Sequence, residues 1–314
     1  MFRTLLVPLD GSELAERALP YATALASAAG GKLALVRVAL APPPATLDGA
    51  TWVQEQSEAV AEAEQYLADV ATRLRTRVAV ETSVPYGRAS SCIVDSITEI
   101  GAEAVVMATH GRTGLKHLLV GSVAEAVIAD SAVPVFVTYA RPGEMPQAPF
   151  DPAHARVIVP LDGSDFARAA LPTAVELVGS SGELVLVCVV EPPDHVEHDE
   201  VGRVVAYLDQ QEEAHTREAR DYLHWVARQM VEKYPGLQVS VEVRVGAPAD
   251  GVIAVAADRV ADLVVVASHG RTGIRRAVFG SVTGAVLRDG FTPVLVVHPR
   301  ISASAASSPV ARVR

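Results

Sequence analysis

The sequence is poor in aromatic and sulfur-containing residues. Only 5% of its 314 residues are aromatic, and it has two cysteines and four methionines. Because half of the residues are hydrophobic, the core must be filled mainly by alanine, valine and leucine, as in compact α/β proteins. Cys92 and Cys188 stand at non-equivalent places in the two halves, so neither a disulfide framework nor a cysteine metal site is indicated.

Long apolar runs and an excess of positive charge are also absent. No segment approaches the roughly 18 to 20 uninterrupted apolar residues of a membrane span. The first apolar run, "LLVPL", is too short for a signal peptide. The formal net charge is -10, which argues against a broad surface for nucleic acid or for an anionic membrane. We therefore expect a soluble, cytoplasmic protein that binds neither nucleic acid nor membrane.

The chain contains two copies of one sequence pattern. "LLVPLDGSELAERALPYA" (5–22) matches "VIVPLDGSDFARAALPTA" (157–174) at an offset of 152 residues. "HGRTGLKHLLVGS" (110–122) matches "HGRTGIRRAVFGS" (269–281) at an offset of 159, so the second copy has gained seven residues between the two phrases. A repeat of this length indicates a duplicated domain, since solenoid repeats have periods of roughly 20 to 50 residues.

The repeat predicts the domain organisation. We expect one domain over residues 1–140 and a second over residues 157–300. The segment 141–156 contains four prolines, which block regular structure, and is predicted to be a linker. Residues 301–314 are small and polar without periodicity, which predicts a disordered tail.

Within each copy, short apolar runs alternate with segments of helical periodicity. In the first copy the runs predict strands at 4–10, 32–40, 78–86, 102–110 and 134–140, and the periodic segments predict helices at 11–31, 54–75, 89–101 and 122–132. Ser12 is a candidate N-cap of the first helix. The alternation predicts an α/β fold: two tandem Rossmann-like domains, each a five-stranded, mostly parallel sheet with helices on both faces.

Two features lie where such sheets bind ligands, beyond the carboxyl ends of the strands. Asp10 and Asp162 follow the first strand of each copy, and a glycine phrase, H-G-x9-G-S, follows the fourth. Glycines allow positive φ and close approach to an oxyanion, and the helix that begins after the second glycine favours a phosphate. The phrase matches neither the Walker A loop nor G-x-G-x-x-G. Each aspartate could instead begin a turn and cap the next helix, and both roles stay open.

At these residues both copies resemble universal stress protein domains, which are adenine nucleotide α-hydrolase-like. The resemblance rests on "VPLDGS", on the closing "VPVFV" and "TPVLV" runs, and on the pattern G-x2-G-x9-G-[S/T] of the ATP-binding branch. Ala108 and Ala267 replace the first glycine of that pattern. The resemblance covers nearly the whole chain apart from the linker and the tail.

The resemblance implies that each domain binds ATP, with Mg²⁺ accompanying the phosphates. In the first copy, the implied contacts with adenosine and phosphates are Asp10, Val38, Met107, Ala108, Gly111, Gly121, Ser122 and Val123. In the second copy they are Asp162, Val189, Val266, Ala267, Gly270, Gly280, Ser281 and Val282. It also implies that the two domains pair through their last strands, and it leaves dimerisation of the whole chain open.

The expected function is regulatory, with ATP occupancy as a signal in a stress response and little or no turnover. No general base and no Walker B context is evident, so we assign no catalytic residue. Two alternatives stay open: a slow ATPase or nucleotidyl-transferring enzyme on the same fold, and an interaction scaffold that binds no nucleotide. The run "DHVEHDE" (194–200) is predicted to be a solvated loop and not a metal site.

Overall fold

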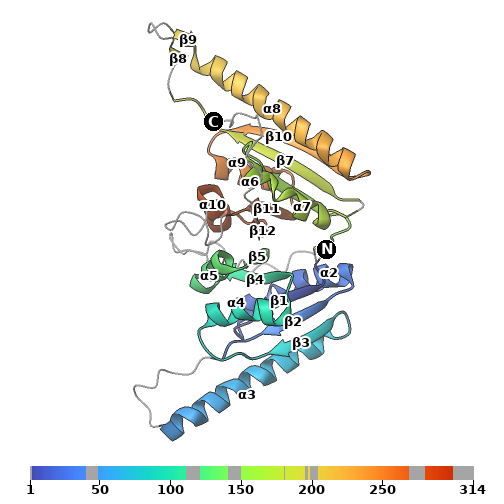
Figure 1. Cartoon of the computed structure of the whole chain (residues 1–314), viewed down its shortest axis with the longest axis vertical. Helices are drawn as coiled ribbons and strands as arrows, with labels where there is room; N and C mark the ends of the chain where they lie inside the picture. Colours follow the sequence, from blue (N-terminus) through green and yellow to red (C-terminus); the bar gives the residue numbers. More distant parts are fainter. Residues whose placement is uncertain are drawn as a thin grey trace. The chain divides into compact units, whose positions relative to one another are not determined.

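Helices and strands alternate along most of the described chain in the computed structural model of Figure 1. The structure describes residues 2–39, 49–110, 121–140, 150–179, 181–194, 197–198, 204–268 and 280–299. Tertiary contacts divide the chain into two units. Unit 1 includes Met1–Asp151 and Pro293–His298, and unit 2 includes Pro152–Ser268 and Gly280–Thr292.

The sheet of unit 1 is built from the predicted apolar runs. Its parallel strands, in spatial order, are β5 (Val135–Ala140), β4 (Ala104–His110), β1 (Thr4–Pro8), β2 (Lys32–Val36) and β3 (Ala79–Ser83). β12 (Val294–Val297) belongs to the same unit and pairs antiparallel with β5. The central strands are buried on both faces, as their unbroken apolar sequences require: Leu5, Leu6 and Val7 of β1 have no exposed surface.

In the described part of unit 1 the helices beside this sheet are α1 (Glu13–Glu16), α2 (Leu19–Ala29), α3 (Gly49–Leu74), α4 (Ala89–Ile100) and α5 (Ser122–Asp130). α2 packs on β1 and β2, and α3 packs on β3 and β2. The predicted single helix over 11–31 is wrong, because the segment forms α1 and α2 with a turn between them. Pro20 lies in the first turn of α2, where its missing N–H costs no hydrogen bond, and it could not continue α1.

Among its described residues, unit 2 has four corresponding parallel strands and not the predicted five, because β12, the last strand of the second copy, is grouped with unit 1. Its parallel strands, in spatial order, are β10 (Gln238–Val245), β7 (Glu183–Val190), β6 (Arg156–Pro160) and β11 (Leu263–Ala267). Its helices are α6 (Asp165–Arg168), α7 (Leu171–Leu177), α8 (Leu208–Lys233), α9 (Pro248–Asp258) and α10 (Ser281–Asp289). The α/β fold with parallel strands and packed helices in both copies is therefore confirmed.

The inserted residues of the second copy contain a short hairpin. β8 (Glu197–His198) pairs antiparallel with β9 (Val204–Ala206). The prediction that 194–200 is only a loop is wrong at the two residues of β8. Among the described residues, no helix is both long and apolar enough to cross a membrane.

The boundary between the units falls inside the predicted linker. Phe150 is buried and its ring lies edge-on to that of Phe136 at 6.2 Å between centroids, so it belongs to the core of unit 1. The backbone oxygen of Pro152 accepts a hydrogen bond from the N–H of Gly179 in unit 2, and β6 begins at Arg156. Residues 141–149 and the predicted tail, 301–314, lie outside the described residues.

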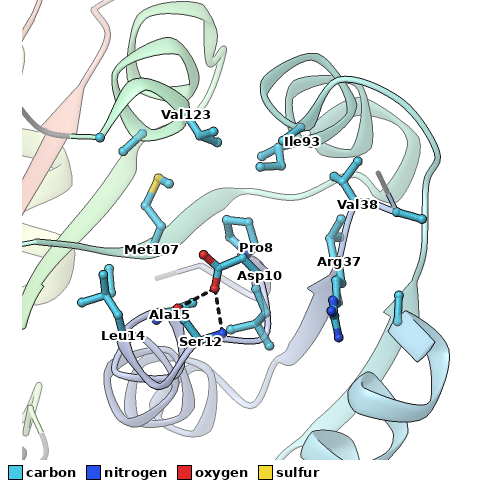
Figure 2. Close-up of a pocket in the computed structure, with 18 of the residues that line it drawn as sticks. Pro8, Asp10, Ser12, Leu14, Ala15, Arg37, Val38, Ile93, Met107 and Val123 are labelled. Carbon is cyan, nitrogen blue, oxygen red and sulfur yellow. Dashed lines mark hydrogen bonds between the residues drawn. The ribbon is translucent and has the colours of Figure 1, made fainter. Parts of the chain in front are cut away.

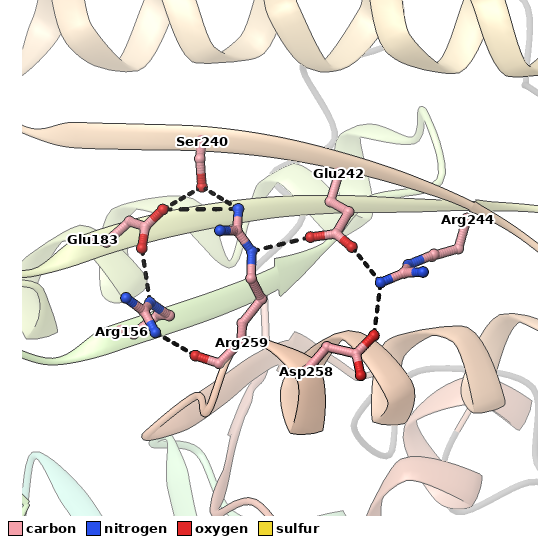
Figure 3. Close-up of polar contacts among 7 residues, drawn as sticks. All are labelled: Arg156, Glu183, Ser240, Glu242, Arg244, Asp258 and Arg259. Carbon is pink, nitrogen blue, oxygen red and sulfur yellow. Dashed lines mark hydrogen bonds and ion pairs between the residues drawn. The ribbon is translucent and has the colours of Figure 1, made fainter.

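A network of charged side chains joins β6, β7, β10 and α9 (Figure 3). Its members are Arg156, Glu183, Ser240, Glu242, Arg244, Asp258 and Arg259. Glu183 accepts hydrogen bonds from Arg156 at 2.7 Å and from Ser240 at 2.5 Å. Burial alone would raise the pKa of Glu183, but these two hydrogen bonds and the charges of Arg156 and Arg259 outweigh it and lower the pKa.

The helices α4 and α9 end with the same backbone motif but different residues. In α4 the motif places Gly101 in the left-handed region at φ 69°, and the N–H of Ala102 bonds to the oxygen of Ile97. In α9 the corresponding residue is Val260, at φ 49°, and the N–H of Ala261 bonds to the oxygen of Ala256. Val260 is the one residue other than glycine that has positive φ in the described ranges.

Candidate functional site

A cavity of about 460 Å³ opens at the carboxyl ends of the strands in unit 1 (Figure 2). The segments after β1 and β2, the end of β4 and the first turn of α5 meet around it, with α3 and α4 closing its sides. They meet there because parallel strands direct all their carboxyl ends to one edge of the sheet. Its volume falls within the roughly 300 to 1,000 Å³ of small-molecule sites.

Nearly all of the site residues predicted in the first copy line this one cavity. They are Asp10, Val38, Met107, Ala108, Gly121, Ser122 and Val123. Gly111, the remaining predicted residue of the first copy, lies outside the described residues. Residues from four separate stretches of the sequence are thus brought together as expected.

The cavity has an apolar side and a polar side. Val38, Ile93, Met107 and Val123 present apolar side chains to it, and Figure 2 shows them around its upper half. Ser122 opens α5, whose first N–H groups have no partner within the helix and carry the positive end of the helix dipole. Such an arrangement can hold a flat apolar group beside an anionic one.

Asp10 begins a turn, as the sequence allowed, but the N-cap of the next helix is Ser12 and not Asp10. Its Oδ1 accepts hydrogen bonds from the N–H of Ser12 at 2.9 Å and from the Ser12 hydroxyl at 2.5 Å, and it lines the cavity. Ser12 is the predicted N-cap of α1, since its Oγ accepts from the N–H of Ala15 at 3.1 Å. Gly11 has φ 90° in the tight turn between them. The turn therefore holds the Asp10 carboxylate in a fixed position at the cavity wall.

Gly121 does not need a glycine's backbone freedom. Its φ is -44° and ψ is 148° as N-cap of α5, so the expected use of positive φ is wrong at this position. A Cβ built on Gly121 would meet no atom of the described residues within 4 Å. Packing against the described part of the chain therefore does not require a glycine at this position. Ala108, in β4, has no positive φ, so the alanine that replaces a glycine of the family pattern is unstrained.

Sequence reasoning missed the wall formed by α3 and the arginine that faces it. Arg37 lines the cavity and pairs with Glu62 of α3 at 2.9 Å. Its guanidinium lies over the ring of Tyr66, 4.9 Å from the centroid. Burial, followed by a hydrogen bond to Glu16, raises the pKa of Tyr66, which stays neutral. The available signal was the charge of Arg37 within the otherwise apolar run "LALVRVAL" (33–40).

The second copy repeats the backbone framework in unit 2. The Oδ1 of Asp162 accepts from the N–H and the hydroxyl of Ser164 at 3.0 and 2.6 Å, and Gly163 has φ 83°. Gly280 is the N-cap of α10, and a Cβ built on it also meets nothing within 4 Å. Thr283 of α10 donates to the backbone oxygen of Ala267 at 3.3 Å, which brings the start of α10 to the end of β11.

The other predicted residues of the second copy lie on the same elements. Ser281 and Val282 are in the first turn of α10, Val266 is buried in β11, and Val189 is in β7. Gly270 lies outside the described residues. Cys188, beside Val189, is buried, and this burial together with the nearby charge of Asp162 raises the pKa of its thiol to about 11.

The residues present are compatible with a magnesium nucleotide but form no protein cage for a metal. Among the residues placed by the structure, no cluster of three or more His, Cys, Asp or Glu could hold a metal ion. Mg²⁺ commonly binds through one or two carboxylates together with substrate phosphates. In the first cavity Asp10 and Ser122 offer oxygen atoms of that kind.

Comparison with known proteins agrees with this architecture. The sequence model of the Universal stress protein family matches residues 1–138 and 154–298. A universal stress protein of Mycobacterium tuberculosis (strain ATCC 25618 / H37Rv) is 29% identical over 258 residues, which cover 82% of each chain. One from Mycolicibacterium smegmatis is 28% identical over 313 residues, 94% of this chain and 97% of the relative.

The fold is also similar to that of a solved structure. The crystal structure of a universal stress protein from Archaeoglobus fulgidus covers 94% of this chain and 98% of its own, with a TM-score of 0.70 at 23% identity. The family match covers both copies and most of the chain. The chain therefore belongs to the universal stress protein family and carries two family domains in tandem.

Proposed function

We propose that the chain binds ATP, accompanied by Mg²⁺, at the carboxyl ends of the strands in each domain, and that occupancy serves a regulatory role in the stress response. The observation that carries the proposal is the first cavity, which gathers Asp10, Val38, Met107, Gly121 and Ser122 around one space. Its apolar side suits an adenine ring, Asp10 suits a ribose hydroxyl, and the N–H groups at the start of α5 suit a phosphate.

The glycines at the helix starts support the same reading. Gly121 and Gly280 are the N-caps of α5 and α10, and among the described residues neither has a neighbour that would exclude a side chain. A phosphate drawn to the N–H groups of the first helical turn would approach the backbone most closely at these glycines. A side chain there would occupy the space that the phosphate needs.

Slow turnover or none fits the carboxylates of the cavity. Asp10 and Glu62 are the acidic residues in its described wall. Asp10 accepts two hydrogen bonds from Ser12, and Glu62 pairs with Arg37. Both carboxylates already hold protein groups, and neither is set up as a general base for water. Steady turnover above roughly 1 s⁻¹, the low end of kinase rates, would contradict this and favour an enzyme.

The proposal is tested by calorimetric titration of the purified chain with ATP and Mg²⁺. We expect saturable binding, one nucleotide per domain, that is lost in a Gly121→Val, Gly280→Val double variant. Because a Cβ at either glycine meets no atom within 4 Å, the variant should fold, which thermal unfolding without ligand checks. Absence of heat in the unaltered chain, after removal of any co-purified nucleotide, would contradict the proposal and favour a scaffold.

The cytoplasmic location and the pairing of the two domains remain proposals as well. Cell fractionation with an antibody to the chain tests the first. Analytical ultracentrifugation of the full chain reports whether it also forms a homodimer. If the chain is a monomer, the proposed nucleotide sites are formed within one chain. Neither result alters the test for nucleotide.

A further inference from the structure

Arg37 is held by contacts with three other residues of unit 1, Glu62, Tyr66 and Gly11. It follows β2 directly and precedes Val38, and its side chain is 20% exposed. Its Nη2 lies 2.9 Å from Glu62 Oε1, and its Cζ lies 4.9 Å from the centre of the Tyr66 ring. On the other side it packs against the turn at Gly11, where an added Cβ would be 3.3 Å from the same Cζ.

The guanidinium therefore connects three separate walls of the cavity. Gly11 belongs to the turn that fixes Asp10, Arg37 itself belongs to the end of β2, and Glu62 and Tyr66 belong to α3. A planar guanidinium can form a charge-assisted hydrogen bond in its plane and stack on an aromatic ring at the same time, which an ammonium group cannot do as well. Figure 2 shows Arg37 beside Asp10, with its charged end directed away from Val123.

The second copy lacks this connection. Val36 pairs with Pro8 in unit 1 and Val187 pairs with Pro160 in unit 2, so the residue that corresponds to Arg37 is Cys188. Cys188 is 2% exposed and too short to reach a helix in the way that Arg37 does.

The long helix of the second copy is held from a different element. "EAEQYLADVA" (62–71) of α3 matches "EARDYLHWVA" (218–227) of α8, so Tyr222 corresponds to Tyr66. In unit 2 the guanidinium over an α8 ring comes from Arg168 of α6, 5.3 Å from the centre of the Trp225 ring. Thus α8 is tied to α6, whereas α3 is tied to the end of β2.

We propose that Arg37 is a positioning residue of the first site and that the two sites are therefore unequal, the first binding adenine nucleotide more tightly. This inference rests on the proposed nucleotide-binding function. Arg37 holds the Asp10 turn, the Val38 backbone and α3 at fixed separations before ligand arrives, so less ordering accompanies binding. In the second site Cys188 provides no such link between the strand end and α8, so we expect more ordering of these two elements on binding, although Arg168 ties α8 to α6.

The test uses full-length chains in which one site remains. Gly280→Val leaves the first site and Gly121→Val leaves the second, and both are titrated with ATP and Mg²⁺. We expect the first site to bind about tenfold more tightly, the scale of one charge-assisted hydrogen bond. Adding Arg37→Met to the Gly280→Val chain should remove that advantage while keeping the apolar stem against Tyr66. Arg37→Lys should restore part of it.

A matched control distinguishes positioning from general stability. Lys32 of β2 pairs with Glu81 of β3 at 2.7 Å, and neither residue lines this cavity. Lys32→Met should therefore leave the affinity of the first site unchanged, with a similar change in unfolding temperature. If Arg37→Met fails to fold, Glu62→Gln is the second variant. Glu62 is largely exposed, and its substitution weakens the ion pair that holds Arg37, so binding should be weaker at the first site alone.

The outcomes separate the two proposals. If the unaltered chain and both single-site chains bind no nucleotide, the nucleotide-binding function itself is overturned. Binding of equal affinity at the two sites, or an Arg37→Met chain that folds and binds as before, overturns the positioning role and leaves the function standing.

Discussion

Val260 occupies a backbone conformation that disfavours its side chain, and its replacement by glycine should stabilise unit 2. At φ 49°, the left-handed region costs an L-residue roughly 1–2 kcal/mol, and more when the side chain is β-branched. The first copy has Gly101 at the corresponding place, with φ 69°. Val260 remains 78% exposed, so little buried apolar surface is lost on removal of its side chain.

Two effects of the substitution oppose one another. Val260→Gly relieves the strain, but a glycine makes the unfolded chain more flexible, which costs about 0.4–1 kcal/mol. The net expectation is a gain of about 1 kcal/mol, or a rise in Tm of roughly 2–4 °C for a domain of this size. Val260→Ala keeps a Cβ at positive φ and should recover less of the gain than glycine.

The assay is scanning calorimetry of the full chain, with Gly101→Val as the reciprocal variant. A Cβ on Gly101 would meet no atom within 4 Å, so any destabilisation of that variant comes from the backbone and not from a clash. Unit 1 should then unfold at a lower temperature, because its free energy of unfolding falls by roughly 1–2 kcal/mol, the cost of the left-handed conformation. An unchanged or lower Tm in Val260→Gly, beside a clear loss in Gly101→Val, would refute the argument that Val260 carries strain.

Four further variants test other features of the fold. Glu183→Gln should destabilise the chain at pH 7, because the lowered pKa of Glu183 in the folded state means that folding stabilises its ionised form. The effect should become smaller as pH falls below about 4.3, the ordinary pKa of glutamate. Urea unfolding at several pH values measures this, and a pH-independent difference would contradict it. Ser12→Ala and Ser164→Ala each remove an N-cap and should cost about 1 kcal/mol in urea unfolding, whereas no change would show that the caps are dispensable. Gly31→Ala would place a Cβ 2.2 Å from the backbone oxygen of Arg3 and should cost about 1–3 kcal/mol of stability by thermal unfolding; an unaltered Tm would mean that β1 moves freely.

Much of the fold and the first site could be predicted because their signals are local. The apolar runs fixed the strands, Ser12 signalled the start of α1, and the repeated glycine phrase pointed to the end of β4. Arg37 could not be assigned in the same way. Whether its guanidinium faces a ligand or Glu62 depends on where α3 lies, and that is decided by packing between segments 25 residues apart.

Val260 and Pro20 show the limits of pattern reading. The repeat aligns Val260 with Gly101, but a sequence cannot say whether the second copy changed its backbone or retained it under strain. Pro20 was visible inside a periodic segment, and its position one turn after Arg17 was compatible with either a kinked helix or two helices. The structure has two helices.

The charged contacts at the beginnings of the strands have a consequence for how the two copies can diverge. In the first copy Lys32 pairs with Glu81 where β2 and β3 begin, and in the second Glu183 meets Ser240 and Arg156 near the starts of β7, β10 and β6. The charge at the start of the corresponding strand is opposite, Lys32 in the first copy and Glu183 in the second, and both side chains have partners. The binding cavity lies at the opposite ends of the strands. Substitutions at the carboxyl ends of the strands can therefore change the binding cavity without disturbing the charged contacts at the beginnings of the strands. One copy of a duplicated domain can in this way acquire a new ligand preference and keep its fold.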